Sequence, residues 1–452
     1  MRTAPLQDTI AAQATPPGRG GVGIVRVSGP HVRPIAKALL GDVPAPRRAV
    51  VRRFLDSSGE TIDRGLALYF PQPRSFTGED VLELQAHGGP IVIDLLVARV
   101  LELGARAARP GEFSQRAFLN GKLDLIQAEA IADLIDSASV EAARSAQRTL
   151  QGHFSDRVRD LMEGVTELRV LVEAAIDFPD EEVDFLTDAS VLARLDELLQ
   201  RLGVTISSAR TGRLLREGLM VVIAGPPNVG KSSLLNRLTE RDSAIVTDIP
   251  GTTRDLLRES IHIDGLPLQL VDTAGLRATS DVIEQQGVER AGKAIDTADI
   301  VLWMVDDRWE DCAQEYLASP QFSTHHETVV VRNKVDLSGQ LPGLVDGREP
   351  PTVRISATTG AGLDVLKARL KATAGYQQST EGSFLARRRH LDALHRTEIA
   401  LRSARNQLCG QFALELVAED LWGAHRSLGE ITGECSSEQL LERIFSSFCI
   451  GK

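Results

Sequence analysis

The chain of 452 residues is poor in cysteine and has no long apolar run. Its four cysteines show neither C-x-x-C nor metal-site spacing, so a reducing cytosol is the expected compartment. An apolar run of about eighteen residues and a signal-peptide core are both missing, so we expect a cytoplasmic protein that does not bind membranes. A net charge of −11 argues against coating by nucleic acid. The densest basic cluster, Arg387–His390, has the composition of a solvated helix face.

A phosphate-binding loop of the form G-x-x-x-x-G-K-[ST] is present at residues 225–232, which read Gly-Pro-Pro-Asn-Val-Gly-Lys-Ser. The apolar, β-branched run 218–224 before it is typical of a buried strand. In such a loop, backbone N–H groups and Lys231 bind phosphate oxygens, while Ser232 opens a helix and can ligate Mg²⁺. The order of strand, loop and helix therefore predicts a nucleotide site.

The motif Asn333-Lys-Val-Asp336 indicates which base is bound. Asp336 can accept hydrogen bonds from N1–H and the 2-amino group of guanine, and adenine offers neither donor on that edge. A site built on such bonds rejects the wrong base by roughly 10⁴-fold. Asn333 and Lys334 are expected to support the ring and the loop. Such a tetrapeptide alone is usually a surface turn, but its position after the strand Val329–Val331 and the phosphate loop predicts guanine specificity.

Three further segments complete a GTPase pattern. Asp272-Thr-Ala-Gly275 follows a strand, so the aspartate can hold Mg²⁺ through water and the Gly275 N–H can sense the γ-phosphate. Gly251–Asp255 offers threonine hydroxyls to the metal, and Ser356-Ala357 is expected to contact the guanine from its far side. Alternating strands and helices over roughly 216–376 predict a mostly parallel sheet with helices on both faces.

The residue that orients the attacking water is not evident from the motif. Ras-like enzymes carry a glutamine directly after D-x-x-G, whereas this chain has Leu276, which cannot donate or accept a hydrogen bond. Hydrolysis must therefore use another polar group or be very slow. Glu284, Asp281 and Arg277 are nearby candidates, and a solvated switch loop is the plain alternative for each. Asn228 carries a neutral oxygen that can coordinate a monovalent cation beside the phosphates, in the role of an arginine finger.

Helical segments flank the nucleotide-binding segment on both sides. Residues 121–215 and 379–452 carry apolar residues at helical spacing, and neither segment forms a complete bundle alone. We therefore expect the two halves to pack together, with a GTPase domain at 216–378 inserted between them. The acidic turn Asp177–Asp184 is more typical of a solvated loop between helices than of a cation site.

Residues 1–120 are predicted to form a small α+β domain. Strand-like runs lie at Val22–Val27, Gly65–Phe70 and Val81–Gln85, and a helix is expected near Ile91–Leu103. The Gly/Pro-rich stretch before the first strand is not a phosphate loop, because it lacks the lysine and leads into a strand. The predicted fold class is thus a multidomain α/β protein with an α+β N-terminal domain, a discontinuous helical domain and an inserted P-loop GTPase domain with a mostly parallel sheet.

The whole chain resembles the MnmE (TrmE) family of tRNA modification GTPases. The resemblance is carried by the inserted GTPase segment and by Asp8–Gly23, Phe76–Gln85, Arg109–Ser114 and the ending Phe448-Cys-Ile-Gly-Lys452. It implies K⁺-stimulated GTP hydrolysis, activated by dimerisation of the GTPase domains. It also implies work with the flavoprotein MnmG to add a carboxymethylaminomethyl or aminomethyl group to carbon 5 of the tRNA wobble uridine.

The resemblance also implies partners, cofactors and site residues. The expected assembly is a homodimer that joins MnmG in a heterotetramer, with tRNA as substrate and FAD held only by MnmG. A 5-formyl- or methylene-tetrahydrofolate would bind the N-terminal domain, which also dimerises, and the matching positions are Arg26, Glu83, Lys122 and Lys452. Surface ion pairs are the plain alternative for these residues. Cys449, near this pocket, is assigned a functional but not nucleophilic role, and a C-terminal lysine makes a prenylation box a poor alternative.

For the nucleotide, the resemblance assigns Glu284 as the catalytic residue that orients the water. Mg²⁺ would be held by Ser232 and Thr253. Potassium would be held by Asn228, Thr247, Ile249 and Thr252, in a loop where Pro250 replaces a common alanine and should stiffen the backbone without removing a ligand. The full set expected to contact GTP is Asn228, Val229, Gly230, Lys231, Ser232, Ser233, Thr247, Thr252, Thr253, Asp272, Thr273, Ala274, Gly275, Asn333, Lys334, Asp336, Ser356 and Ala357.

Two other functional classes share part of this pattern. A ribosome-assembly GTPase of the Era/EngA class would carry the same nucleotide motifs but should end in an RNA-binding domain. A dynamin-like GTPase would show membrane-binding features, which are missing from the sequence. The sequence does not indicate which folate is used, where tRNA binds, or how closure of the GTPase domains reaches the modification centre.

Overall fold

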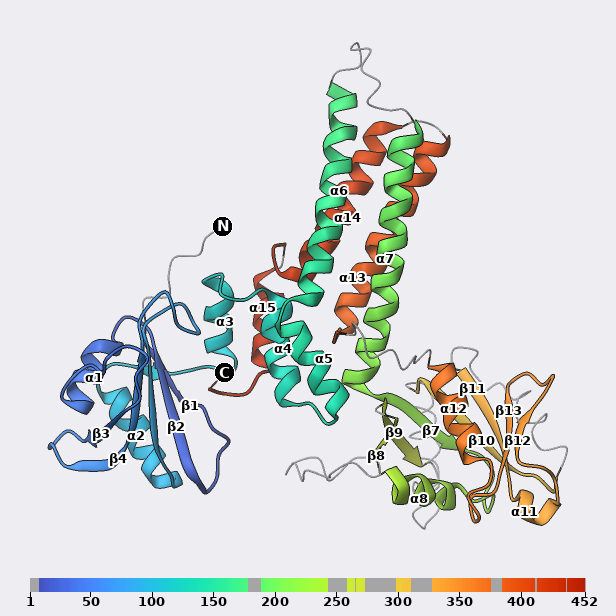
Figure 1. Ribbon diagram of the computed structural model, residues 1–452, viewed down its shortest axis with the longest axis horizontal. Helices are drawn as coiled ribbons and strands as arrows, with labels where there is room; N and C mark the ends of the chain where they lie inside the picture. Colours follow the sequence, from blue (N-terminus) through green and yellow to red (C-terminus); the bar gives the residue numbers. More distant parts are fainter. Residues whose placement is uncertain are drawn as a thin grey trace, which may run out of the picture. The chain divides into compact units, whose positions relative to one another are not determined.

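The computed structural model describes residues 8–177, 188–242, 258–264, 266–272, 298–309, 327–374, 384–410, 413–435 and 437–451 (Figure 1). The chain forms two compact units. One contains Met1–Ile135, Thr149–Leu202 and Ala393–Lys452, and the other contains Asp136–Arg148 and Gly203–Asp392. The division into four segments made from the sequence remains a prediction.

The N-terminal domain is built on a six-stranded sheet of order β3-β4-β5-β2-β1-β6. Its strands are β1 (Ile10–Gln13), β2 (Gly20–Ser28), β3 (Val50–Leu55), β4 (Thr61–Phe70), β5 (Val81–Gly88) and β6 (Arg106–Ala107). All neighbours are antiparallel except β1 and β6. Helices α1 (Val32–Leu40) and α2 (Pro90–Glu102) pack on this sheet (Figure 1). The predicted strands lie within β2, β4 and β5, and the predicted helix coincides with α2 to within one residue at each end, which confirms the α+β prediction.

Alternation along β2 gives the two faces of this sheet different chemistry. Val25 and Val27 are fully buried in a core that they share with residues of α1 and α2. Because successive side chains of a strand point to opposite faces, Arg26 lies on the other face. On that face, Phe113 of α3 (Glu112–Leu119) joins a second, smaller cluster with Ile10 of β1. The second face of the sheet therefore places a charged side chain, Arg26, on the same side as the aromatic ring of Phe113.

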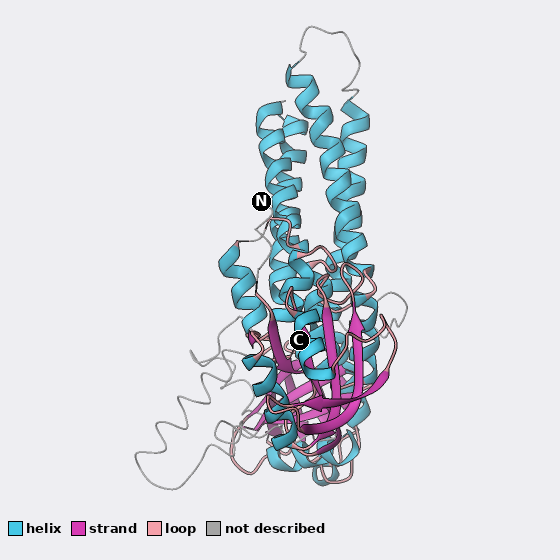
Figure 2. Ribbon diagram, turned by 90° about the vertical axis from the view of Figure 1, so that its left-hand side faces the viewer, coloured by secondary structure: helices cyan, strands magenta, loops and turns pink. Residues whose placement is uncertain are grey.

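The helical part combines segments from both sides of the nucleotide-binding domain in sequence. Its helices are α4 (Leu125–Ile135), α5 (Val140–Leu150), α6 (His153–Asp177), α7 (Asp188–Glu217), α13 (Arg388–Gly410), α14 (Leu414–Thr432) and α15 (Glu438–Ser446). Helix α14 packs along α6, and the two lie beside α7 and α13 (Figures 1 and 2). This confirms the discontinuous helical domain. None of the described helices has the length and apolar content needed to cross a bilayer.

Apolar residues at helical spacing within these helices are buried, as predicted, but one residue predicted to be exposed is also buried. Leu161 and Leu168 of α6 and Leu394 and Leu401 of α13 are all buried. The prediction that Arg387–His390 forms a solvated helix face is wrong for His390, which is buried and accepts a hydrogen bond from the backbone N–H of Arg387 at 3.1 Å. The imidazole caps the start of α13, so the basic cluster is smaller than its sequence indicates.

The nucleotide-binding domain has a seven-stranded sheet of order β12-β13-β11-β10-β7-β9-β8. Its elements are β7 (Leu219–Ala224), α8 (Lys231–Asp242), β8 (Arg258–Ile263), β9 (Leu266–Asp272), β10 (Ile300–Asp306), β11 (Glu327–Asn333), α11 (Val335–Ser338), β12 (Gly343–Val345), β13 (Thr352–Ile355) and α12 (Leu363–Thr373). The five central strands are parallel, and only the edge strands β12 and β8 are antiparallel. Every residue of β10 is buried, as expected where both faces of a parallel sheet are covered. The prediction of a mostly parallel sheet is confirmed.

Candidate functional site

Those predicted nucleotide residues that the structure describes gather at one edge of the seven-stranded sheet. The parallel strands β7, β9, β10, β11 and β13 all end there, and ligands of such sheets bind outside the carboxyl ends of the strands. The phosphate loop follows β7, and Asp272 is the last residue of β9, paired with Ile223 of β7. Asn333 ends β11, and Ser356 follows β13. Motifs up to about 130 residues apart in sequence therefore share one edge.

The phosphate loop depends on backbone conformations that few residues adopt. Gly225 has φ of 142°, and a Cβ there would lie 2.2 Å from the carbonyl oxygen of Met304. Gly230 has φ of 99°, and its Cβ would lie 2.4 Å from Nδ2 of Asn333. Asn228 is left-handed with φ of 63°, a conformation that asparagine tolerates better than most residues. The glycines of the motif are therefore required by close packing as well as by the turn.

Lys231 is buried at the first position of α8 and donates to its own loop. Its Nζ lies 2.8 Å from the carbonyl oxygen of Gly225 and 2.7 Å from that of Pro226. Ser232 and Ser233 follow in the first turn and are exposed. The positive end of the helix dipole lies at this turn, so the loop combines a point charge, the N–H groups of a helix N-terminus and a hydroxyl that suits Mg²⁺.

The guanine motif is joined directly to the phosphate loop. Nδ2 of Asn333 donates to the carbonyl oxygen of Val229 at 2.8 Å, and Nζ of Lys334 donates to that of Asn228 at 2.6 Å. Oδ1 of Asn333 accepts from the backbone N–H of Ala357 at 2.9 Å. Asn333 is buried, so its amide fixes three segments of the site at once. The base-binding and phosphate-binding motifs therefore form a single site.

The remaining base-side residues lie beside this bridge. Asp336 is in the first turn of α11 and is exposed, which leaves its carboxylate accessible to a base. Ser356 is buried, and its Oγ accepts from the backbone N–H of Thr359 at 3.1 Å. Ala357 is buried next to it. The turn 356–361 is thus shaped by local hydrogen bonds and is placed by Asn333.

Two aspartates at the end of β10 support this site, and sequence reasoning missed both. Asp306 is buried and accepts from Lys334 Nζ at 2.9 Å and from Arg308 Nη2 at 2.8 Å. Asp307 is buried and accepts from Arg332 Nε at 2.6 Å. The hydrogen bonds from Arg308 are the main cause that holds the pKa of Asp306 far below its usual range; burial opposes them and Lys334 adds to them. An acidic pair directly after an apolar strand was the available signal.

Several predicted site residues lie outside the described residues. They are the catalytic candidate Glu284, the switch and potassium-loop residues Thr247, Ile249, Thr252 and Thr253, the residues Thr273, Ala274 and Gly275, and the C-terminal Lys452. For these positions the assignments remain predictions.

Two of the predicted folate residues meet on the second face of the N-terminal sheet. Arg26 of β2 and Glu83 of β5 are direct strand partners, and Nε of Arg26 lies 2.9 Å from Oε1 of Glu83. The guanidinium lies 5.7 Å from the ring centroids of both Phe76 and Phe113. Its Nη1 donates to the carbonyl oxygen of Gly451 at 3.3 Å. A cation between aromatic rings, paired with a carboxylate, can bind a planar polar ring.

The C-terminal tail returns to this face. Gly451 has φ of 95°, and a Cβ there would lie 2.1 Å from the carbonyl oxygen of Gln13. Cys449 has an exposed side chain, and its carbonyl oxygen accepts from the backbone N–H of Gly111 at 3.4 Å. Lys122 is exposed and donates to the carbonyl oxygen of Pro73 at 3.1 Å, on the loop that carries Phe76. The structure thus places Arg26, Glu83 and the tail together, with Lys122 on an adjoining loop.

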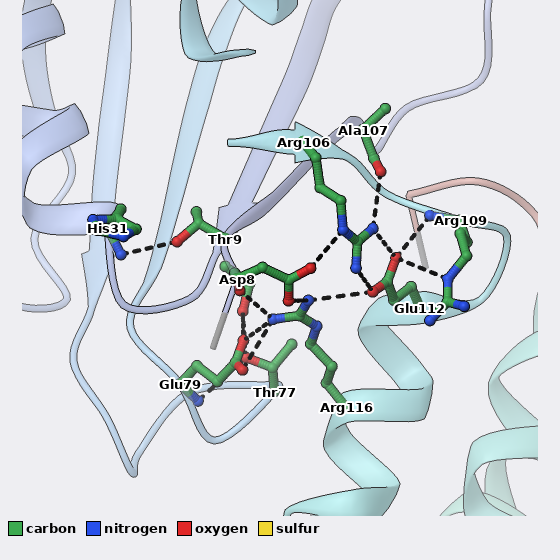
Figure 3. A network of polar contacts seen from close by, with 11 residues as sticks. Asp8, Thr9, His31, Thr77, Glu79, Arg106, Ala107, Arg109, Glu112 and Arg116 are labelled. Atoms are coloured by element: carbon green, nitrogen blue, oxygen red, sulfur yellow. Dashed lines mark hydrogen bonds and ion pairs between the residues drawn. The ribbon is translucent and has the colours of Figure 1, made fainter. Parts of the chain in front are cut away.

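A buried ionic network supports the loop that receives the tail (Figure 3). Nη2 of Arg116 donates to Oδ1 of Asp8 at 2.7 Å and to Oε1 of Glu112 at 3.2 Å, and its Nη1 lies 3.1 Å from Oε1 of Glu79. Nη1 of Arg106 donates to Oε2 of Glu112 at 2.8 Å. Arg116 and Glu112 are almost completely buried. Opposite charges compensate one another here, as buried ions require.

Two family profiles match the chain. The profile of the MnmE helical domain matches residues 125–449, and that of the N-terminus of the GTP-binding protein TrmE matches residues 9–122. The tRNA modification GTPase MnmE of Chromohalobacter salexigens is 58% identical over 458 aligned residues, which cover 100% of both chains. The relationship therefore spans the whole sequence.

Solved structures with similar folds match only part of the chain. Era of Aquifex aeolicus is 27% identical with a TM-score of 0.26, and the match covers 40% of this chain and 66% of Era. The G domain of the FeoB iron transporter of T. maritima is 26% identical with a TM-score of 0.26, covering 34% of this chain and 98% of that domain. Similarity at this level carries no argument about function.

Proposed function

The chain belongs to the MnmE (TrmE) family of tRNA modification GTPases, and on that premise we propose that it uses potassium-stimulated GTP hydrolysis to drive modification of the tRNA wobble uridine. The observation that carries the nucleotide part is the bridge from Asn333 and Lys334 to the carbonyls of Val229 and Asn228. It unites a guanine-reading loop and a phosphate loop in one site. The role in tRNA modification is supported by the family relationship.

The described residues suit GTP and its cations. Lys231 and the start of α8 bind the phosphates, and Asp336 reads the guanine. The hydroxyl of Ser232 would hold Mg²⁺, together with Thr253. Asn228 is exposed, and Lys334 donates to its backbone carbonyl. The side-chain amide oxygen of Asn228 would hold K⁺ together with Thr247, Ile249 and Thr252. Bound potassium would supply positive charge where the phosphate charge develops.

Within this proposal, Glu284 orients the attacking water. A carboxylate can accept a hydrogen bond from that water, which Leu276 cannot do. Two copies of the GTPase domain meet face to face during hydrolysis, so dimerisation takes the place of an activating protein. The homodimer works with MnmG, which carries the FAD, in a heterotetramer in the cytoplasm, and tRNA is the substrate that receives the carboxymethylaminomethyl or aminomethyl group.

The N-terminal domain is proposed to bind 5-formyl- or methylene-tetrahydrofolate. The contacts of Arg26 with Glu83, Phe76 and Phe113 support a site for a planar, polar ring, and the carbonyl of Gly451 places the tail beside it. Lys452 and Lys122 would supply positive charge for the glutamate tail of a folate. Cys449 has a functional but not nucleophilic role near this pocket. The alternative of a ribosome-assembly GTPase rests only on the distant fold matches.

Hydrolysis rates measured in K⁺ and in Na⁺ at equal ionic strength test the nucleotide part. We expect at least about tenfold faster turnover in K⁺, because the cation stabilises charge in the transition state. Equal rates would contradict the cation mechanism. The variant Glu284→Ala should bind nucleotide normally and lose about 10²-fold or more in kcat. Unchanged turnover would exclude Glu284 as the catalytic residue.

Deletion of the protein from cells tests the role in tRNA modification. If tRNA kept its full wobble-uridine modification after deletion, that role would be excluded.

A further inference from the structure

Asp306 occupies a central position that the nucleotide motifs do not account for. It ends β10, is 7% exposed, and accepts from Lys334 Nζ at 2.9 Å and from Arg308 through two nitrogens, Nε at 3.0 Å and Nη2 at 2.8 Å. Neither Asp306 nor Arg308 belongs to the predicted nucleotide site. A buried carboxylate that accepts from a motif lysine restricts where that lysine can point.

Lys334 carries this restriction into the phosphate loop. Its Nζ donates to the carbonyl oxygen of Asn228 at 2.6 Å, and the neighbouring Asn333 donates to that of Val229. Lys334 is itself left-handed, with φ of 72°, and so is Asn228, with φ of 63°. Two residues with left-handed backbones, Lys334 and Asn228, are therefore joined by one charge-assisted hydrogen bond. The ammonium of Lys334 is held between a carboxylate and the carbonyl of the proposed potassium ligand.

We propose that Asp306 is a positioning residue that acts through Lys334 to fix the backbone of Asn228, and thereby sets the affinity of the site for potassium. A cation site needs its oxygen ligands in place before binding, because every ligand ordered on binding lowers the affinity. This inference rests on the proposed potassium role of Asn228. It adds a residue outside the set that we propose to contact the nucleotide or the cation.

The variant Asp306→Asn tests the inference with little change in shape. It removes the negative charge that holds the Lys334 ammonium, so Lys334 gains freedom and the carbonyl of Asn228 loses its partner for part of the time. In sodium buffer without potassium, we expect hydrogen exchange in a peptide spanning 225–232 to become at least about threefold faster. The concentration of K⁺ that gives half-maximal GTP hydrolysis should rise about tenfold, with kcat at saturating K⁺ within about twofold of the wild type.

Arg308→Gln is the matched control. It removes the other cation of Asp306 from a side chain that is 47% exposed, and it leaves the contact between Asp306 and Lys334 intact. We expect its exchange rate and its K⁺ requirement to stay within about twofold of the wild type. Thermal unfolding of both variants establishes that they are folded. If Asp306→Asn fails to fold, Asp306→Glu is measured instead, and its longer side chain should displace Lys334 and raise the K⁺ requirement in the same direction.

A double-mutant cycle with Lys334→Met tests whether Asp306 acts on the phosphate loop through Lys334 or independently of it. If Asp306 acts through Lys334, adding Asp306→Asn to Lys334→Met should change neither exchange nor K⁺ requirement further. Additive effects would overturn the inference, as would wild-type values for Asp306→Asn. A wild-type enzyme indifferent to K⁺ would instead overturn the proposed function, while hydrogen exchange in sodium buffer would still show whether Asp306 holds the phosphate loop.

Discussion

Glu112, at the residue scale, is a charge that the fold buries completely. Its carboxylate accepts from Arg106, from Arg116 and from the backbone N–H of Arg109 (Figure 3). Burial alone raises the pKa of Glu112, but the hydrogen bonds from Arg106 and Arg109 and the charge of Arg106 outweigh burial, so the pKa falls to about 2. The network therefore stabilises the ionised form that it encloses.

This shift predicts how stability depends on pH. The pKa is lower in the folded state than its ordinary value of 4.5, so the contribution is complete above about pH 4.5 and is lost as the pH falls toward 2. A shift of this size corresponds to roughly 3 kcal/mol. We expect Glu112→Gln to lose about 3 kcal/mol of unfolding free energy at pH 7, with a smaller difference from the wild type at pH 2.5. Urea unfolding at both pH values measures the two differences.

Glu102→Gln is the control for this prediction. Glu102 also pairs with an arginine, Arg99, but its side chain is 59% exposed. Exposed pairs contribute little, so the variant should stay within about 0.5 kcal/mol of the wild type at both pH values. A Glu112→Gln variant that loses equal stability at pH 7 and pH 2.5 would show that packing, and not charge, explains its effect.

Asp336 leads to a prediction about base selection. Asp336→Asn replaces one of the two carboxylate oxygens, which accept from N1–H and from the 2-amino group of guanine, with an amide nitrogen that can only donate. The affinity for GDP should therefore fall by about 10²-fold or more. Affinity for XDP should rise, because the amide can donate to the additional carbonyl oxygen of xanthine. Fluorescence titration with GDP and with XDP measures both affinities. Asp346→Asn, at an exposed turn of the same domain, should alter neither affinity. Unchanged GDP affinity in Asp336→Asn would show that another group reads the base.

The sequence predicted the residues that we propose to contact the nucleotide, but not the residues that hold those side chains in place. The phosphate loop and Asn333 were recognisable because their chemistry is encoded in short spacings. Asp306 and Arg116 were missed because their partners are set by the fold: Arg116 meets Asp8, which is 108 positions away. Local patterns carry no information on such pairs. The acidic pair at the end of β10 becomes informative only when the sheet order places Asp306 beside Lys334.

At the scale of elements, helix α15 is fixed by one glycine of the N-terminal domain. Gly111 has φ of 66°, and a Cβ there would lie 2.4 Å from the carbonyl oxygen of Phe445 and 3.0 Å from Cβ of Phe448. Its N–H also donates to the carbonyl oxygen of Cys449. Any side chain at this position must push α15 and the following tail away, and with them the contact between Arg26 and Gly451.

Gly111→Ala should therefore weaken both docking of the tail and the proposed binding of folate. We expect faster hydrogen exchange over 438–451 and a fall of at least about tenfold in the affinity for 5-formyl-tetrahydrofolate. Gly59→Ala is the matched control, because Gly59 is also left-handed with φ of 86° but has open space around its Cβ. It should lose about 1 kcal/mol from backbone strain alone, whereas Gly111→Ala should lose about 1–3 kcal/mol more from overpacking. Equal effects of the two variants would mean that the tail is not held at Gly111.

At the scale of the whole molecule, the fold class could be predicted from sequence patterns. The contact between the C-terminal tail and the N-terminal sheet could not. Apolar periodicity gave the two helical halves, and the order of strands and motifs gave the parallel sheet. Helix α7 continues from Asp188 to Glu217, and only Gly218 separates it from β7, so no loop marks the passage from the helices to the sheet. The hydrogen bond from Arg26 to Gly451 joins residues 425 positions apart, and here resemblance to a family indicated the association where periodicity could not.

Two compact units built from interleaved segments predict how the protein unfolds. GDP binds only the unit that contains the phosphate loop, so it should stabilise that unit and leave the other unchanged. With GDP at about 100 times its Kd, the gain is about 2.7 kcal/mol, which corresponds to several degrees in Tm. We expect calorimetry to show two transitions, of which only one moves with GDP.

The folate ligand provides the reciprocal test, because the proposed folate residues belong to the other unit. Adding 5-formyl-tetrahydrofolate should raise the transition that GDP leaves in place. Lys231→Ala should keep both transitions and abolish only the shift caused by GDP, since this variant loses the charge that binds the phosphates. A single transition that moves with either ligand would show that the units unfold together. In that case, binding at one site would stabilise the other, and GTP would be linked energetically to the proposed folate site without any change in the contacts of either site.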